Sequence, residues 1–98
     1  MIPGSEIDTD PHYEMTLYVT GASRLSLLAV SRVRDFCEQE LPGHYHLEVV
    51  DLYRSPERAK SAHVIAAPTL LREQPAPLRR VIGDMSDRAR LSAAIKVV

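Results

Sequence analysis

The chain has 98 residues, 45% of them apolar, and a formal net charge of −1 at pH 7. This length allows one domain with a modest core, and the apolar content excludes a wholly disordered chain. No apolar stretch reaches the roughly 18 residues of a membrane span, and the first residues lack a secretory signal pattern. The single cysteine, Cys37, excludes a disulfide framework and a four-cysteine zinc site. We therefore expect a cytoplasmic protein without membrane contact.

The charges are distributed unevenly along the chain. Residues 1–14 hold four of the 13 acids and no lysine or arginine, which leaves 9 acids and all 12 basic residues to the remainder. Six of the basic residues lie from Arg72 onward. Because acids are interspersed among them and aromatic residues are few, we expect an acidic protein partner rather than nucleic acid.

The first half of the chain predicts a tail, a strand, a helix and a second strand. Residues 1–14 mix proline, glycine and acids without an apolar period, which predicts a flexible tail before a domain over 15–98. Residues 15–21 are rich in strand-forming side chains and end at a glycine. Apolar residues then recur at helical spacing to about residue 41, with Ser23 or Ser26 as the N-cap. Residues 45–53 predict a strand that is buried on both faces, as in a parallel sheet.

The second half begins with a short predicted helix over 55–63, where a serine, a proline and an acid form a typical helix start. Residues 64–72, VIAAPTLLR, predict a third strand interrupted by Pro68, although proline is normally confined to a strand's edge or first residue. Residues 78–83 predict a fourth strand, antiparallel to the third, and residues 86–97 a terminal helix.

These elements give the order βαβαββα, with a four-stranded mixed sheet and three helices. The first three elements form a right-handed parallel crossover. A four-stranded mixed sheet covered by three helices is the thioredoxin-like arrangement, so we predict an α/β thioredoxin-like fold. In that fold a cis proline starts the third strand, and Pro68 stands at this position.

Enzymatic chemistry is not indicated by any group of residues. Thioredoxin-type catalysis needs a low-pKa thiolate at the start of the first helix, but the corresponding turn, GASRLSLL, has no cysteine. Cys37 falls late in that helix on its apolar stripe, where we expect a protonated core thiol. His44 and His46 could share one strand face, but two ligands are weak evidence for a metal. We therefore predict a protein that is not an enzyme and has no metal or other cofactor.

Three segments carry a family resemblance: LYVTG at 17–21, LEVVDLYRSPERA at 47–59 and IAAPTLLREQPAPLRRVIGDMSDR at 65–88. In this order they resemble the KaiB family of circadian-clock proteins over about residues 15–96. The resemblance implies a regulator that binds the ring-shaped ATPase KaiC and, in cyanobacteria, then sequesters KaiA or displaces the histidine kinase SasA. A sensor module of the SasA type is the alternative. Because no kinase follows Val98, we expect a free-standing KaiB-like protein.

The resemblance also implies two folds, because KaiB proteins are metamorphic. One state is a tetramer with the order βαββααβ, and the other is the thioredoxin-like monomer that binds KaiC. This chain has Ala94 and Lys96 where clock members commonly have glycine and aspartate. Alanine is better than glycine in a helix by about 1 kcal/mol, and lysine suits a helix C-terminus. We therefore expect the monomer, with the tetramer as the alternative.

Eight residues are the candidates for these functions. We predict that three arginines contact a KaiC-type ATPase, because of their charge and their position in the matching motif: Arg72, Arg79 and Arg80. A solvated basic face is the alternative for each of them. The predicted cis-proline and fold-switch positions are Pro68, Pro75, Pro77, Ala94 and Lys96. A thioredoxin-class redox protein is a further alternative, but the chain lacks its dithiol.

Overall fold

The computed structural model describes residues 11–97, so most of the predicted tail lies outside the described residues. Its elements in chain order are β1 (Tyr13–Val19), α1 (Arg24–Glu40), β2 (Tyr45–Asp51), α2 (Pro56–Ser61), β3 (Thr69–Gln74), β4 (Arg79–Ile82) and α3 (Arg88–Ile95). The strands form one sheet in the order β2-β1-β3-β4. β1 is parallel to β2, and β3 is antiparallel to both β1 and β4. The predicted βαβαββα order and mixed sheet are confirmed.

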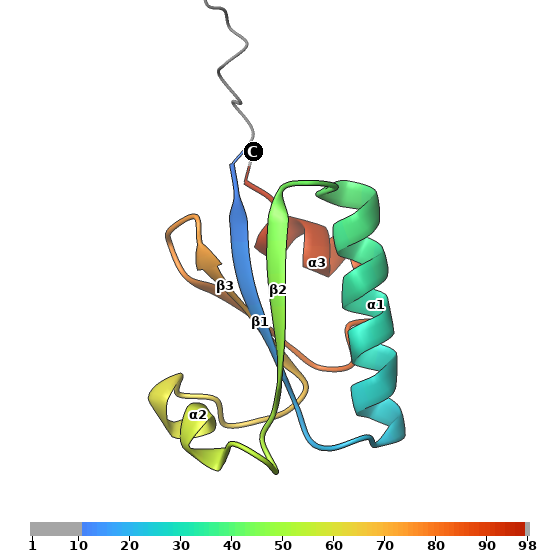
Figure 1. Cartoon of the computed structure of the whole chain (residues 1–98). Helices are drawn as coiled ribbons and strands as arrows, with labels where there is room; N and C mark the ends of the chain where they lie inside the picture. The colour runs from blue at the N-terminus through green and yellow to red at the C-terminus, as the bar shows by residue number, and fades with distance from the viewer. Residues whose placement is uncertain (1–10, 98) are drawn as a thin grey trace, which may run out of the picture.

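The sheet separates two layers of unequal size. α1 and α3 cover one face, whereas the short α2 lies on the other side, near one end of the sheet (Figure 1). In β1, alternate side chains point to the main core under α1 and α3, beginning with Tyr13 and Met15. On the opposite face Tyr18 belongs to a smaller cluster with Val50, Val64 and Leu71, against which the alanines of α2 and its C-cap pack.

The helices begin where local chemistry predicts, whereas α2 and α3 end two residues before the predicted ends. The Ser23 side chain caps α1 by accepting a hydrogen bond from the Ser26 backbone N–H. α2 has Pro56 at its first position and α3 is capped by the Asp87 side chain, which accepts from the Arg90 backbone N–H. None of the helices within residues 11–97 is long and apolar enough to cross a membrane.

Several strand boundaries differ from the prediction, and the largest differences at a strand start are those of β1 and β3. β1 begins at Tyr13, two residues before the expected start, because the Tyr13 ring is buried in the main core. β3 begins only at Thr69, and residues 64–68 are irregular. Pro68 has no N–H to donate to a strand ladder, which places the strand start after it. The Pro68 carbonyl still accepts a 3.0 Å hydrogen bond from the Gly83 N–H, and the Ala67–Pro68 peptide bond is cis.

Candidate partner-binding surface

The three candidate arginines occupy different environments. Arg72 lies on β3 with its side chain directed into the protein, and only 3% of its surface is exposed. Its Nη1 donates to the Ile95 carbonyl at 2.8 Å, and its Nη2 donates to the Pro77 carbonyl at 2.7 Å. This guanidinium is therefore not presented on the surface of the protein.

Arg79 and Arg80, by contrast, are both exposed on β4, the edge strand of the sheet. Arg80 donates one hydrogen bond, of 3.0 Å, to the His63 carbonyl at the end of α2. Within residues 11–97 the Arg79 guanidinium has no hydrogen-bonding or ion-pair partner. The adjacent Leu78 is 51% exposed although it is apolar. Because side chains alternate along a strand, Leu78 and Arg80 share one face of the β3–β4 hairpin, whereas Arg79 lies between them on the other face.

A hollow of about 400 Å³ lies beside this hairpin, between it and α2. Its lining residues are Tyr18, Arg58, Ser61, Ala62, His63, Leu71, Glu73, Leu78 and Arg80. The Glu73 carboxylate accepts a 2.9 Å hydrogen bond from the Thr16 hydroxyl, which directs it along the sheet. The sequence analysis missed this hollow because its lining comes from α2 and three strands.

The other predicted positions lie around the same hairpin and at the end of α3. The peptide bonds before Pro75 and Pro77, in the turn between β3 and β4, are cis. Ala94 is half-buried and packs against the main core. Lys96 is the C-cap of α3, and its Nζ lies 3.0 Å from Oε1 of Glu40.

The position of a thioredoxin dithiol, at the start of α1, is occupied by hydroxyl groups. The Ser23 hydroxyl donates to the Ser26 hydroxyl, which in turn donates to the Thr20 carbonyl. Cys37 lies three turns further along α1, where burial raises the pKa of its thiol to about 12. A thiol with this pKa remains protonated at neutral pH and is a poor nucleophile.

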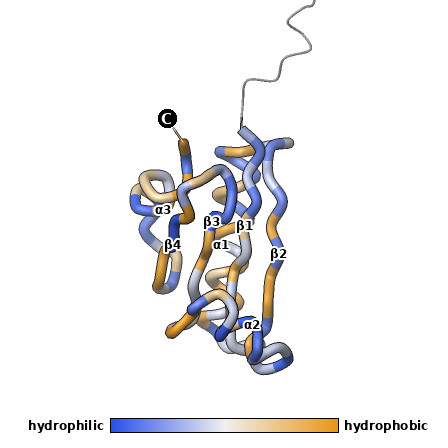
Figure 2. The backbone as a smooth tube through the Cα atoms, turned by 90° about the vertical axis from the view of Figure 1, so that its left-hand side faces the viewer, coloured by the Kyte–Doolittle hydropathy of each residue, from blue (hydrophilic) through white to orange (hydrophobic). Residues whose placement is uncertain are grey.

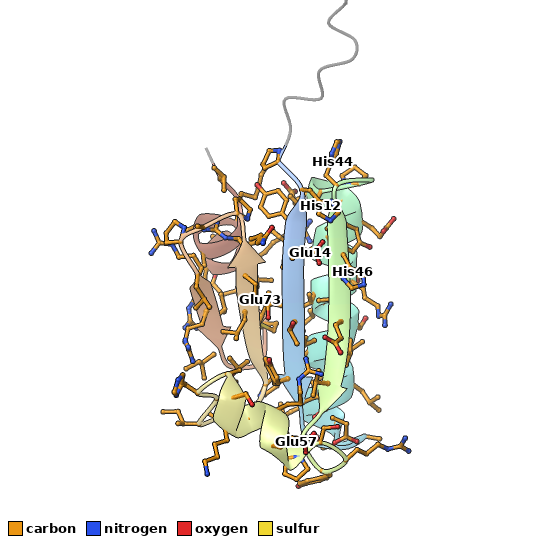
Figure 3. The ribbon with its side chains drawn as sticks, turned by 60° about the vertical axis from the view of Figure 1, so that its left-hand side comes forward. His12, Glu14, His44, His46, Glu57 and Glu73 are labelled. Atoms are coloured by element: carbon orange, nitrogen blue, oxygen red, sulfur yellow. The ribbon has the colours of Figure 1, made fainter. Side chains whose placement is uncertain are left out.

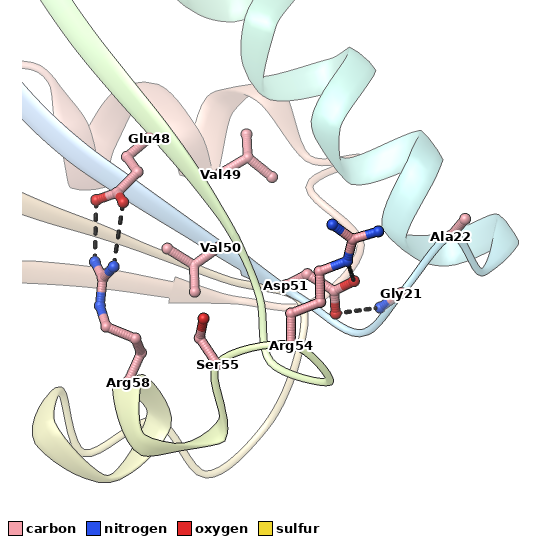
Figure 4. Close-up of a pocket in the computed structure, with 9 residues that line it drawn as sticks. All are labelled: Gly21, Ala22, Glu48, Val49, Val50, Asp51, Arg54, Ser55 and Arg58. Atoms are coloured by element: carbon pink, nitrogen blue, oxygen red, sulfur yellow. Dashed lines mark hydrogen bonds and ion pairs between the residues drawn. The ribbon is translucent and has the colours of Figure 1, made fainter.

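A second pocket, of about 450 Å³, lies at the carboxyl ends of β1 and β2 (Figure 4). Its charged groups neutralise one another. Arg58 makes two hydrogen bonds to Glu48, of 3.0 and 3.2 Å. Asp51 accepts from the N–H groups of Gly21 and Tyr53, both at 2.9 Å, and these bonds hold its pKa below the ordinary aspartate value. We assign these contacts a structural role, since they close the turns after both strands.

The histidines at the opposite end of the sheet meet a carboxylate rather than one another. Figure 3 shows His12, Glu14 and His46 on the face of the sheet that α1 does not cover. The two oxygens of Glu14 lie 2.7 Å from Nε2 of His12 and 3.1 Å from Nδ1 of His46. In residues 11–97, no three histidine, cysteine or acidic side chains are arranged to hold a metal ion.

Comparisons with known proteins bear on both fold and family. The N-terminal domain of SasA from Synechococcus elongatus superposes with a TM-score of 0.71 at 18% identity, over 95% of this chain and 85% of that domain. Mitochondrial thioredoxin 3 from Saccharomyces cerevisiae gives a TM-score of 0.68 at 15% identity, over 85% of this chain and 76% of the thioredoxin. At these identities the likeness establishes the thioredoxin-like fold.

The sequence relatives are more specific. The circadian clock oscillator protein KaiB of Prochlorococcus marinus (strain MIT 9313) is 42% identical over 79 residues, which are 81% of this chain and 66% of that protein. The circadian clock protein KaiB3 of Synechocystis sp. is 33% identical over 84 residues, which are 86% of this chain and 82% of the relative. The KaiB domain family itself matches residues 16–97. The chain is therefore a member of the KaiB family.

Proposed function

We propose that this protein is a non-catalytic regulator in the cytoplasm that binds a KaiC-type ATPase ring through its β3–β4 hairpin. The observation that carries the proposal is the exposed guanidinium of Arg79, which has no partner among residues 11–97 and lies within the KaiB-family match over 16–97. No internal hydrogen bond or ion pair within residues 11–97 has to be broken before this guanidinium can contact another protein. Arg80, next to it in sequence, has one hydrogen bond among the described residues, to the His63 carbonyl.

The chemistry of the hairpin favours an acidic partner segment that also carries an apolar side chain. Two arginines supply planar donors that suit carboxylates, and complementary charge accelerates association. The exposed Leu78 and the adjacent hollow supply apolar area that water covers in the free protein. Arg72 is left out of this contact, because its donors are directed to the Ile95 and Pro77 carbonyls. A KaiA-like or SasA-like regulator is a second class of partner, to be tested on the same surface.

We further propose that the thioredoxin-like monomer is the resting state. Ala94 supports it because alanine favours a helix over glycine by about 1 kcal/mol. Lys96 supports it through its position at the C-terminus of α3 and its ion pair with Glu40. Size-exclusion chromatography with light scattering should give a monomer mass, and a tetramer mass at micromolar concentration would contradict the proposal.

The binding proposal is tested by measuring the affinity of the purified protein for the KaiC-type ATPase of the same organism. The double variant Arg79→Glu/Arg80→Glu should lose most of the binding. The matched control is Arg24→Glu/Arg34→Glu, which makes the same charge change at exposed positions of α1. Equal affinity of the two double variants would show that Arg79 and Arg80 do not contribute to the interface. Absence of binding by the unmodified protein would refute the ATPase as partner.

A further inference from the structure

The buried Arg72 side chain hydrogen-bonds to two segments that lie far apart in the sequence. One is the last residue of α3, whose Ile95 carbonyl accepts from Nη1. The other is the turn between β3 and β4, where the Pro77 carbonyl accepts from Nη2. We call these two hydrogen bonds the Arg72 bridge. Both are short; the bond to Ile95 is buried, and the bond to Pro77 is partly buried because Pro77 itself lies at the surface.

The chemistry of the bridge is unusual for a buried cation. Within residues 11–97 no carboxylate forms an ion pair with Arg72, and its Nε is buried without a hydrogen-bond partner. The charge is balanced only by carbonyl dipoles. The Ile95 carbonyl is one of the last four of a helix, which lack intrahelical donors and carry the negative end of the helix dipole. A planar guanidinium can donate in two directions at once, whereas a lysine ammonium is a compact point charge on a flexible stem.

The position of the bridge connects it with the hairpin. Arg72 is the register partner of Arg79 across β3 and β4, so the bridge spans the turn that immediately precedes Arg79 and Arg80. α3 also lies close beside β4, as Figure 2 shows. The other polar contacts of α3 go elsewhere: Lys96 pairs with Glu40, and Arg88 donates to Gln39, both at the end of α1.

We propose that Arg72 is a positioning residue that couples the attachment of α3 to the conformation of the β3–β4 turn, and thereby presents Arg79 and Arg80 to a partner. Loosening of either segment then loosens the other. The coupling between α3 and the turn stands on the two hydrogen bonds, whereas its effect on partner binding rests on the proposed function.

The coupling is tested by amide hydrogen exchange, measured residue by residue by NMR. Arg72→Met keeps an unbranched apolar chain of similar length but removes both donors. Hydrogen bonds to charged groups contribute enough that exchange in both segments should accelerate about ten- to a hundredfold. The amides to compare are those of Lys96 and Val97 and those of β4. Exchange in the centre of β1 should change much less. Arg72→Lys, which retains the charge but not the fork, should give an intermediate acceleration.

The matched control is Lys96→Met, which removes the ion pair to Glu40 without touching the Arg72 bridge. It should accelerate exchange at the end of α3 and, through the intact bridge, accelerate exchange in β4 by less than Arg72→Met does. The proposal is overturned if Arg72→Met accelerates only one of the two segments, or all amides of the sheet by one factor. It is also overturned if Lys96→Met affects β4 as strongly as Arg72→Met does.

Affinity for the KaiC-type ATPase supplies the functional readout. Arg72→Met should bind at least about tenfold more weakly although Arg79 and Arg80 are intact, and Arg72→Lys should recover part of the loss. Arg79→Glu/Arg80→Glu should lose binding with normal exchange in α3. Unchanged affinity in Arg72→Met, with binding by the unmodified protein, would refute the presentation of the hairpin. If the unmodified protein does not bind, the proposed function fails, and the exchange data alone decide the coupling.

Discussion

α1 and α3 cover the same face of the sheet, but different forces hold them there. α1 buries apolar side chains at helical spacing along most of its length, among them Val33 and Phe36. α3 buries only Leu91 and Ile95. The longer helix is therefore held mainly by the hydrophobic effect, which is non-directional and proportional to buried apolar area.

The remaining attachments of α3 are polar and individually removable. Besides the Arg72 bridge, the Val97 N–H donates to the Tyr13 hydroxyl at 2.9 Å. Lys96 and Arg88 both reach Glu40 at the end of α1, at 3.0 and 3.4 Å. Each of these contacts requires a particular position of its two partner groups, and added salt weakens the exposed ion pairs. Because its contacts are separate and polar, we expect the C-terminal segment to loosen one contact at a time. The apolar contacts under α1 should instead be lost together, when the whole domain unfolds.

The largest expected effect comes from the α1 interface. Phe36→Ala should lower the free energy of unfolding by about 3–5 kcal/mol, because it leaves a cavity under a fully buried ring. It also removes the ring over which the Arg88 guanidinium lies, 5.5 Å from the centroid. Urea unfolding followed by circular dichroism measures the loss. Leu27→Ala, at an exposed position of the same helix, is the control and should cost under about 0.5 kcal/mol. A loss of stability below about 1 kcal/mol for Phe36→Ala would contradict the conclusion that buried apolar side chains hold α1 on the sheet.

A smaller and local effect is expected at the end of α3. Tyr13→Phe removes the hydroxyl that accepts from Val97 and should cost about 1 kcal/mol. Exchange of the Val97 amide should accelerate, while amides in the middle of α1 should keep their rates. Equal acceleration in both helices would show that α3 is not independently attached.

Much of this architecture was predictable because local patterns and tertiary packing agree. The order of strands and helices, Ser23 as one of two candidate caps of α1, and the family all followed from the sequence. The start of β1 was placed too late, although Tyr13 continues the inward alternation of Met15 and Leu17. Glu14 lies between Tyr13 and Met15 on the other side of the sheet, as the alternation requires, and its charge had grouped it with the acids of the predicted tail.

The burial of Arg72 was not predicted, because the prediction rested on its charge and its place in the family motif and left out the alternation of strand side chains. Arg72 follows Leu70 by two residues, and in a strand that spacing places both side chains on the same face. Leu70 is completely buried in the main core, so the period alone indicates an inward arginine. What the sequence could not supply was the pair of carbonyls, at Pro77 and Ile95, that accept its hydrogen bonds. These two residues are brought together only by the folding of α3 onto the sheet.

Acidification should distinguish the polar attachments of α3 from the apolar core. Hydrogen bonds from Lys96 and Arg88 hold the pKa of Glu40 below the ordinary glutamate value. The carboxylate therefore stabilises the folded protein at neutral pH, and this contribution is lost as the pH falls through the lowered pKa. Glu40→Gln should be less stable than the unmodified protein at neutral pH, and the difference should shrink in acid. Thermal unfolding across this pH range measures it, with Asp35→Asn on the exposed side of α1 as the control. A difference independent of pH would contradict the ionic origin.

The smallest effect at neutral pH is expected where α1 meets β2. The Tyr45 hydroxyl donates to the Glu38 carboxylate, which raises the pKa of Tyr45 to about 12. Because the folded state favours the protonated phenol, the bond stabilises the fold up to about pH 10 and is lost as the pH rises through about 12. Glu38→Gln should therefore lower the pKa of one tyrosine toward 10 in an ultraviolet titration of tyrosinate, while amide exchange in α3 stays unchanged. An unaltered titration would show that Tyr45 and Glu38 are not hydrogen-bonded in solution. Within residues 11–97 theirs is the only side-chain hydrogen bond between α1 and β2.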